Sequence, residues 1–374
     1  IKTKLQRKLA DDKDLLVALR GDREDPHPHQ VVAEVFEDAR VLRPADDVGV
    51  HLVRLLGVEQ LAAGLLAVHP HGEVVDARPA GDREQVSGFE VAVGVAERAH
   101  AMGALAEAGD GCDVFPGPIL RFAAEEAVER GLQGVQSVTG LTGGDAVLLQ
   151  NYIAQGKSLS GDLLLDAVSK AVATNEVNAA MGTICATPTA GSAGVVPGTL
   201  FAVKNKLNPT REQMIRYLFT SGAFGFVVAN NASISGAEGG CQAEVGSAAG
   251  MAAAAIVEMA GGTPQQCSEA FAITLKNMLG LVCDPVAGLV EVPCVKRNAM
   301  GAANSLVAAD MALAGVTSRI PCDEVIGAMY RIGQSMSPNL KETARGGLAA
   351  TPTGKAISKA ILENGGLQSI KAIQ

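Results

Sequence analysis

The sequence predicts an all-α fold: a helical domain with loops rich in Gly, Asn and Cys, preceded by an N-terminal region of doubtful fold. Hydrophobic residues make up 48% of the 374-residue chain, but aromatic residues only 3%, and there is no Trp. The core must therefore be built from small side chains, which let helices pack closely. From residue 122 onward apolar residues recur at helical spacing, while the alternating pattern of strands is scarce.

The expected helices follow one another with short loops. The first lies in EEAVERGLQGVQS and should end near Gly131. Thr210 and Thr263 are typical N-cap residues for two later helices, and Pro321 opens the last one. GTICATPTAGSAGVVPG is predicted to be a turn-rich loop. The other helical segments are SGDLLLDAVSKAVATNEVNAAMG, PTREQMIRYLFTSGAFGFVVANN, AEVGSAAGMAAAAIVEMAGG, TPQQCSEAFAITLKNMLGLV, NSLVAADMALAGV and PCDEVIGAMYRIGQSM.

Residues 1–121 differ in composition from residues 122–374, and we expect a boundary there. All six histidines lie in the first hundred residues, the first Asn is Asn151, and no lysine stands between Lys13 and Lys157. A folded domain of this length rarely lacks Asn altogether. The region is either a divergent domain, a disordered segment, or a wrong-frame or wrong-strand translation joined to a genuine gene. Its two HPH motifs do not by themselves indicate a metal site.

Charge and hydropathy exclude several function classes. The net charge of −9 argues against a general affinity for nucleic acid or for an anionic membrane surface. The longest uncharged stretch, residues 177–203, contains Pro188 and Pro197 and is interpreted as a loop followed by a buried helix, not as a membrane span. No apolar leader follows the charged first residues, so a cytoplasmic protein is expected.

Three of the seven cysteines lie in turn-like segments that are rich in Gly and Pro: Cys241, Cys283 and Cys294. No C-x-x-C pair exists and no histidine follows His100, which disfavours a zinc site. Three thiolates from separate loops suit an iron–sulfur cluster with one iron open to substrate. On spacing alone, the alternative that these cysteines are small core residues stays open.

Several long motifs carry a family resemblance. ATNEVNAAMGTICATPTAGSAGVVPGTLFA, NNASISGAEGGCQAEVGSAAGMAAAAIVEMAGG, CDPVAGLVEVPCVKRNAMGAANS and GGLAATPTG resemble the α chain of the iron–sulfur L-serine dehydratases, over about Glu125 to Lys355. The resemblance implies a [4Fe–4S] cluster held by Cys241, Cys283 and Cys294. It further implies L-serine as substrate, pyruvate and ammonia as products, a β subunit as partner, and an oligomer. Cys185 also lies in a family motif.

Substrate and base residues are expected in the loops near these cysteines. Removal of a Cα proton needs a histidine, a lysine or a carboxylate with a shifted pKa. The candidates are Glu176 and Lys276, with Glu238 and Glu244 beside Cys241, and a base supplied by the β chain is a further interpretation. The residues expected to bind substrate are Ser192, Gly194, Asn231, Ser233, Arg297 and Asn298.

Four other functions were weighed against serine dehydration. A pyridoxal-phosphate enzyme would need α/β structure around a Schiff-base lysine, which the pattern does not predict. A non-catalytic iron–sulfur protein would have no need for the Asn/Ser/Gly-rich loops. A related amino-acid lyase, such as a cysteine desulfidase, stays open, because these residues do not reveal whether hydroxyl or thiol is the leaving group. A defective fusion that binds no cluster is the last alternative.

Overall fold

The computed structural model describes residues 66–68, 74–76 and 116–364 of the chain. The chain divides into two units, residues 1–84 and 85–374, which we describe separately. In the first unit, β1 (Leu66–Val68) and β2 (Val74–Asp76) pair as antiparallel strands. Within residues 1–121 the structure describes only these two strands and the start of the first helix of the second unit. The hypotheses on the rest of this region fall outside the described residues.

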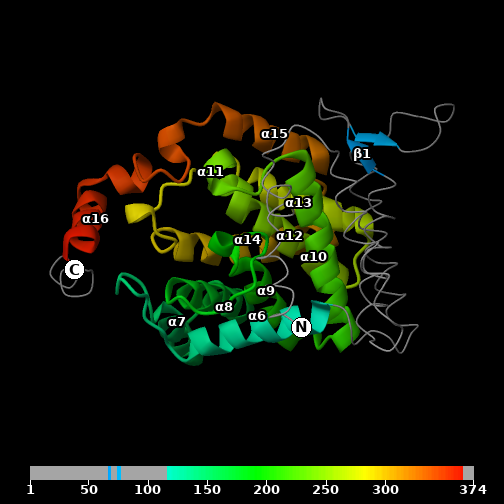
Figure 1. The fold of residues 1–374 in the computed structure, drawn as a ribbon. Coiled ribbons are helices and arrows are strands. Elements are labelled where there is room, and N and C mark those ends of the chain that lie inside the picture. Colours follow the sequence, from blue (N-terminus) through cyan, green and yellow to red (C-terminus); the bar gives the residue numbers. More distant parts are fainter. Residues whose placement is uncertain (1–65, 69–73, 77–115, 365–374) are drawn as a thin grey trace, which may run out of the picture. The chain divides into compact units, whose positions relative to one another are not determined.

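The second unit is helical throughout its described part (Figure 1). Over residues 116–364 the structure contains helices and two isolated β-bridges but no strand, so the all-α prediction is confirmed there. None of the helices in the described ranges combines the length and apolar character that a membrane span needs. The main helices are α6 (Pro116–Leu132), α7 (Asp145–Ala154), α8 (Asp162–Ala179), α9 (Val195–Leu207), α10 (Arg211–Asn231), α12 (Ser247–Met259), α13 (Pro264–Lys276), α14 (Cys294–Leu313), α15 (Cys322–Ser335) and α16 (Pro352–Asn364).

Short elements connect these helices around the loops that carry the polar motifs. They are the 3₁₀ turns η2 (Ala190–Ser192), η4 (Val286–Gly288), η5 (Pro338–Leu340) and η6 (Gly347–Ala350), the single turn α11 (Gly236–Gly239) and the π-helical turn η3 (Gln242–Gly246). The π turn leads directly into α12. Such turns within helices are frequent at functional sites.

Helix α12 lies at the centre of the unit and packs against α9, α10, α13 and α14 (Figure 1). All its residues except Glu258 are buried, and most are Ala or Gly. The small side chains let large neighbours approach its backbone. A Cβ atom at Gly250 would lie 2.7 Å from the ring of Phe271, which stacks on Phe224 at a centroid distance of 5.1 Å. The scarcity of aromatic residues is therefore offset by close helix packing.

Glycine also allows close helix packing in a second layer, where α8 packs against α6, α9 and α14. A Cβ atom at Gly198 would lie 2.7 Å from the backbone nitrogen of Ala171, so α8 and α9 cross at close range. This layer fixes the N-terminus of α9, and with it the loop of residues 185–194 that precedes the helix.

The predicted helix starts at Thr210, Thr263 and Pro321 agree with the structure. Thr210 and Thr263 each form a capping box, with Gln213 and Gln266 respectively. Pro321 is the N-cap residue of α15. Helix α8 begins after Gly161 without a side-chain cap. Helix α14 starts at Cys294, ten residues before the expected segment, so this cysteine is helical. Helix α6 spans the expected boundary at residue 122, and the division into domains stays a prediction.

Candidate metal centre

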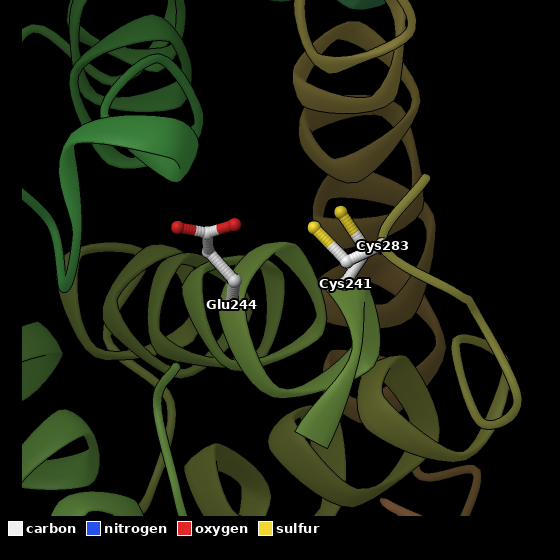
Figure 2. A group of neighbouring side chains, drawn as sticks. All are labelled: Cys241, Glu244 and Cys283. Atoms are coloured by element: carbon white, nitrogen blue, oxygen red, sulfur yellow. The ribbon is translucent and has the colours of Figure 1, made fainter. Parts of the chain in front are cut away.

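The side chains of Cys241, Cys283 and Glu244 converge at the start of the π turn. The two sulfur atoms and a carboxylate oxygen all lie within 4.8 Å of one another. Figure 2 shows the two thiols side by side, with the Glu244 carboxylate projecting from the next turn in the same direction. Cys241 and Cys283 are buried, with exposed fractions of 1% and 3%. Soft sulfur ligands and a carboxylate gathered in this way are suited to a metal ion.

Each cysteine is held by a different type of element. Cys241 immediately precedes the π turn, so its side chain and that of Glu244 emerge one turn apart. Cys283 lies between α13 and η4, where its N–H donates to the carbonyl of Leu340 and its carbonyl accepts from Glu342 N–H, at 2.8 and 2.7 Å. Cys294 is the first residue of α14 and is 6% exposed. Chain segments far apart in sequence therefore meet at the thiols.

The backbone around Cys283 is unusual as well. Ala287 has φ +57°, Glu342 has φ +62° and Ala344 has φ +54°, all in the left-handed region that residues with a Cβ rarely adopt. Such conformations cost free energy and persist where the surrounding structure enforces them. Here they accompany the bonds that tie the Cys283 segment to residues 340–342.

Two glycines leave the space around the thiols and Glu244 open. A Cβ atom on Gly236 would lie 3.0 Å from the Cys283 sulfur and 3.1 Å from the Glu244 carboxylate. A Cβ atom on Gly191 would lie 2.6 Å from the same carboxylate. Both glycines are buried, and neither has a positive φ. Glycine is therefore required at both positions by the lack of space for a side chain and not by the backbone conformation.

The site is rich in acidic groups. Burial raises the pKa of the Cys294 thiol to about 12, and the charges of Cys241 and Glu244 add to this effect. A hydrogen bond with Cys241, together with burial, raises the pKa of the Cys283 thiol. Burial raises the pKa of Glu244 too; a hydrogen bond from Thr189 Oγ1, 2.5 Å away, opposes this rise. The Cys294 thiol is not part of the group within 4.8 Å, but the charges of Cys241 and Glu244 act on it.

Arg297 brings a positive charge to these acidic groups. Its guanidinium donates to the carbonyl of Val282 at 2.7 Å and pairs with Asp284 at 2.8 Å. A hydrogen bond with Cys283 lowers the pKa of the Cys241 thiol, burial opposes this, and the charge of Arg297 lowers the pKa further.

Three of the residues predicted to bind substrate form an internal hydrogen-bond network. The Asn298 amide donates to the carbonyls of Gly191 and Cys294, and its oxygen accepts from Gly194 N–H at 3.1 Å. Ser192 bonds within its own turn, to the carbonyl of Thr187 and to the side chain of Thr189. These three residues are buried, and they join the loop of residues 187–194 to the first turn of α14.

The other predicted residues lie on neighbouring turns. Ser233 donates to Glu238 at 2.7 Å, and Asn231 donates to the carbonyl of Val227 at the end of α10. Among the candidate bases, Glu176 accepts from the N–H of Asp145 at 2.7 Å and so caps α7. Lys276 donates to the carbonyl of Ser318 at 2.6 Å. The structure therefore gives Glu176 and Lys276 bonds that anchor a helix and a loop.

Several groups at the centre were not singled out from the sequence. Thr189 orients Glu244, Asp284 pairs with Arg297, and Gly236 borders the Cys283 sulfur. Asp284 follows Cys283 directly, and Gly236 belongs to the same motif as Cys241, so adjacency was the only available signal. Cys185 instead lines a mainly apolar cavity of about 390 Å³ beside α9 and α10, with Pro188, Phe226 and Met251.

The donor set fits a cationic centre bound through sulfur. The charges of Cys241 and Glu244 raise the pKa of the Cys283 and Cys294 thiols, because anionic groups in a poorly solvated site repel one another. A metal ion deprotonates the thiols that bind it and offsets this repulsion. Gly191 and Gly236 keep side chains out of the space beside the donors. The residues present are thus compatible with the iron–sulfur cluster that the sequence suggested.

Comparisons with known proteins identify the family of the chain. Residues 119–349 match the family model described as serine dehydratase alpha chain. The "Probable L-serine dehydratase, alpha chain" of Bacillus subtilis (strain 168) is 83% identical over 237 residues, covering 63% of this chain and 79% of that protein. Its namesake in Latilactobacillus sakei is 64% identical over 200 residues, covering 54% of this chain and 96% of that one.

A third relative has a different length. The "L-serine dehydratase" of Streptomyces coelicolor is 48% identical over 181 residues, which cover 48% of this chain but only 40% of that protein. The family match spans more than half of the present chain and includes all three cysteines of the centre, together with Glu244 and Arg297. The chain belongs to the serine dehydratase alpha chain family.

Proposed function

We propose that this chain is the α chain of an L-serine dehydratase, a lyase that converts L-serine to pyruvate and ammonia. The observation that carries the proposal is the gathering of Cys241, Cys283 and Glu244 at one buried site, inside the segment that matches the family. The names of the relatives support serine as the substrate.

We propose that Cys241, Cys283 and Cys294 hold a [4Fe–4S] cluster. When bound, such a cluster supplies an open, Lewis-acidic iron that polarises the bond between the serine Cβ and its hydroxyl oxygen. Three protein ligands leave the fourth position for substrate, as in catalytic metal sites generally. The contact between the two thiols would be replaced by bonds to the cluster.

Glu244 is the side chain we assign to the proton transfer. Its carboxylate stands beside the thiols, and the bond from Thr189 holds one oxygen in place. A carboxylate whose pKa is raised by burial is suited to accept a Cα proton. Loss of this proton and of hydroxide from serine gives an enamine, which tautomerises and hydrolyses to pyruvate and ammonia without further groups from the protein.

The residues predicted to bind substrate are proposed to shape the site. Ser192, Gly194 and Asn298 fix the loop that brings Thr189 to Glu244, and Ser233 holds the turn before α11. Asn231 at the end of α10 is exposed and is proposed to contact substrate from the edge of the site. Glu176 and Lys276 are not proposed as the base, because their bonds anchor α7 and the loop at Ser318.

A partner chain is part of the proposal. Two of the relatives are named as alpha chains, and this chain covers 79% and 96% of them but only 40% of the relative named simply L-serine dehydratase. We infer that the additional sequence of the longer protein corresponds to a separate β chain here. We propose a cytoplasmic hetero-oligomer that assembles from the two.

The test is turnover by anaerobically prepared protein mixed with its partner chain. We expect pyruvate from L-serine, and iron and sulfide in the α chain. A cysteine desulfidase would give pyruvate and sulfide from L-cysteine faster than pyruvate from L-serine. Iron–sulfur content without turnover of either amino acid, in the presence of the partner, would favour a non-catalytic iron–sulfur protein.

A further inference from the structure

One side chain connects two of the three segments that carry the predicted cysteine ligands. Arg297 lies in the first turn of α14, three residues after Cys294. Its guanidinium donates to the carbonyl of Val282 and pairs with Asp284, the two neighbours of Cys283. We propose that Arg297 is the positioning residue that holds Cys283 in place relative to Cys294 for metal binding. This inference rests on the proposed role of the three cysteines as ligands.

The contacts of Arg297 attach the Cys283 segment to a core helix. The backbone of Cys283 bonds residues 340 and 342, which themselves belong to a loop. Arg297 connects the segment to α14, which packs against α12 and α8 in the core. A planar guanidinium can contact a carbonyl and a carboxylate at once because its five N–H groups form a fixed fork.

The network extends beyond the guanidinium. The second carboxylate oxygen of Asp284 accepts a hydrogen bond from Leu348 N–H at 2.6 Å. Gly347 has φ +55°, and a Cβ atom there would lie 2.2 Å from the same oxygen, so the backbone can approach Asp284 only as glycine. Leu348, Asp284 and Arg297 thus form one chain of contacts, from the C-terminal loop to the first turn of α14.

These contacts distinguish positioning from substrate binding, which the sequence suggested for Arg297. The guanidinium already donates to the Val282 carbonyl and pairs with Asp284, and the Arg297 side chain is 16% exposed. A substrate carboxylate would have to displace Asp284, which is 3% exposed in its side chain and would then be left buried without its cation. The guanidinium is therefore committed to the protein, where it orients the segment of one proposed ligand against the helix that carries another.

The test measures metal binding by the metal-free protein, so it does not depend on turnover. The protein is prepared without metal under argon and titrated with Co²⁺, whose thiolate complexes absorb in the near ultraviolet. We expect Arg297→Gln to weaken Co²⁺ binding about 10–100-fold, the usual cost of losing a residue that orients a metal ligand. Arg297→Lys should recover only part of this loss, because an ammonium cannot bond both Val282 and Asp284 as a fork.

Lys296→Gln is the matched control. Lys296 is the adjacent residue on α14, its side chain is 60% exposed, and its ion pair with Asp145 lies at the surface, so its loss should leave Co²⁺ affinity unchanged. Thermal unfolding of each metal-free variant shows whether the fold is retained. If Arg297→Gln is too unstable to titrate, Asp284→Asn tests the same network and should weaken Co²⁺ binding in the same direction.

The outcomes separate this inference from the proposed function. Wild-type protein that binds Co²⁺ through thiolates but never acquires iron and sulfide would contradict the proposed cofactor, and a loss in Arg297→Gln would still support the positioning role. Equal Co²⁺ affinity in folded wild-type and Arg297→Gln protein would overturn the positioning role, whatever the cofactor. An increase in KM for L-serine with unchanged Co²⁺ affinity would identify Arg297 as a substrate-binding residue and would equally overturn it.

Discussion

Two groups of buried cysteines in this protein have the same exposure and different surroundings. Cys267 on α13 and Cys322 at the start of α15 are each 1% exposed, as is Cys241. Burial raises the pKa of Cys267 to about 12, and the charge of Glu258 adds to it. Neither thiol belongs to the group formed by Cys241, Glu244 and Cys283. Burial therefore does not distinguish Cys241 and Cys283 from Cys267 and Cys322; convergence with other donors does.

The comparison is tested most severely by removing one thiol from each group. Cys283→Ala should abolish iron binding and serine turnover together, because the remaining ligands cannot hold a cluster. Cys267→Ala should retain both and lose about 1 kcal/mol of unfolding free energy. Iron content and thermal unfolding check the pair. Full iron content in Cys283→Ala would refute the ligand assignment.

Glu244 is expected to have the next largest effect. Glu244→Gln keeps the side chain's size and its contact with Thr189 but removes the negative charge. We expect kcat to fall about 10²–10⁴-fold, the usual contribution of a positioned acid–base group, with iron content unchanged. Steady-state kinetics on iron-loaded protein with its partner chain measures this. Wild-type kcat in an iron-loaded Glu244→Gln variant would exclude the proton-transfer role.

Gly236 tests whether the open space at the thiols matters. A Cβ atom there would lie 3.0 Å from the Cys283 sulfur, so Gly236→Ala should displace that thiol and weaken metal binding about 10-fold. Gly222→Ala is the control, because nothing lies within 4 Å of its Cβ position. Co²⁺ titration of both variants measures the effect. Identical affinities would show that the space is not required.

The substitution that we expect to affect metal binding least lies in the core. Gly250→Ala forces a methyl group to within 2.7 Å of the Phe271 ring, and we expect it to destabilise the fold by about 1–3 kcal/mol. Iron per folded chain should not change, because Gly250 lies on α12 beyond the π turn. Chemical denaturation with iron analysis separates the two properties. A stable variant that loses iron would mean that core packing and the metal centre are coupled.

Local signals predicted most of the helices, but not α7 or α16, and the site only in part. The capping boxes at Thr210 and Thr263 each involve two residues that are three apart in the chain. A local sequence pattern is therefore enough to predict them. The start of α14 at Cys294 was missed because Pro293 and the turn before it suggested a loop. The contact of Cys283 with residues 340–342 depends on tertiary packing, which no local pattern reveals.

Roles within the site were harder to predict than its ligands. The three cysteines could be named through the family resemblance, but the partners of Arg297, Asn298 and Glu176 could not. Each has a side chain suited to substrate or proton transfer, and each forms bonds to distant backbone groups in the structure. A polar residue near a motif has many neighbours in the fold, and sequence position does not show which of them it meets.

The most direct measurement is the iron and acid-labile sulfide content of the chain purified without oxygen, with its visible spectrum recorded before and after L-serine. The account predicts about four of each per chain in the wild type and in Cys267→Ala, a spectrum that serine changes, and neither iron nor sulfide in Cys283→Ala. Wild-type protein without iron or sulfide, or with a content that the loss of Cys283 does not alter, would contradict it.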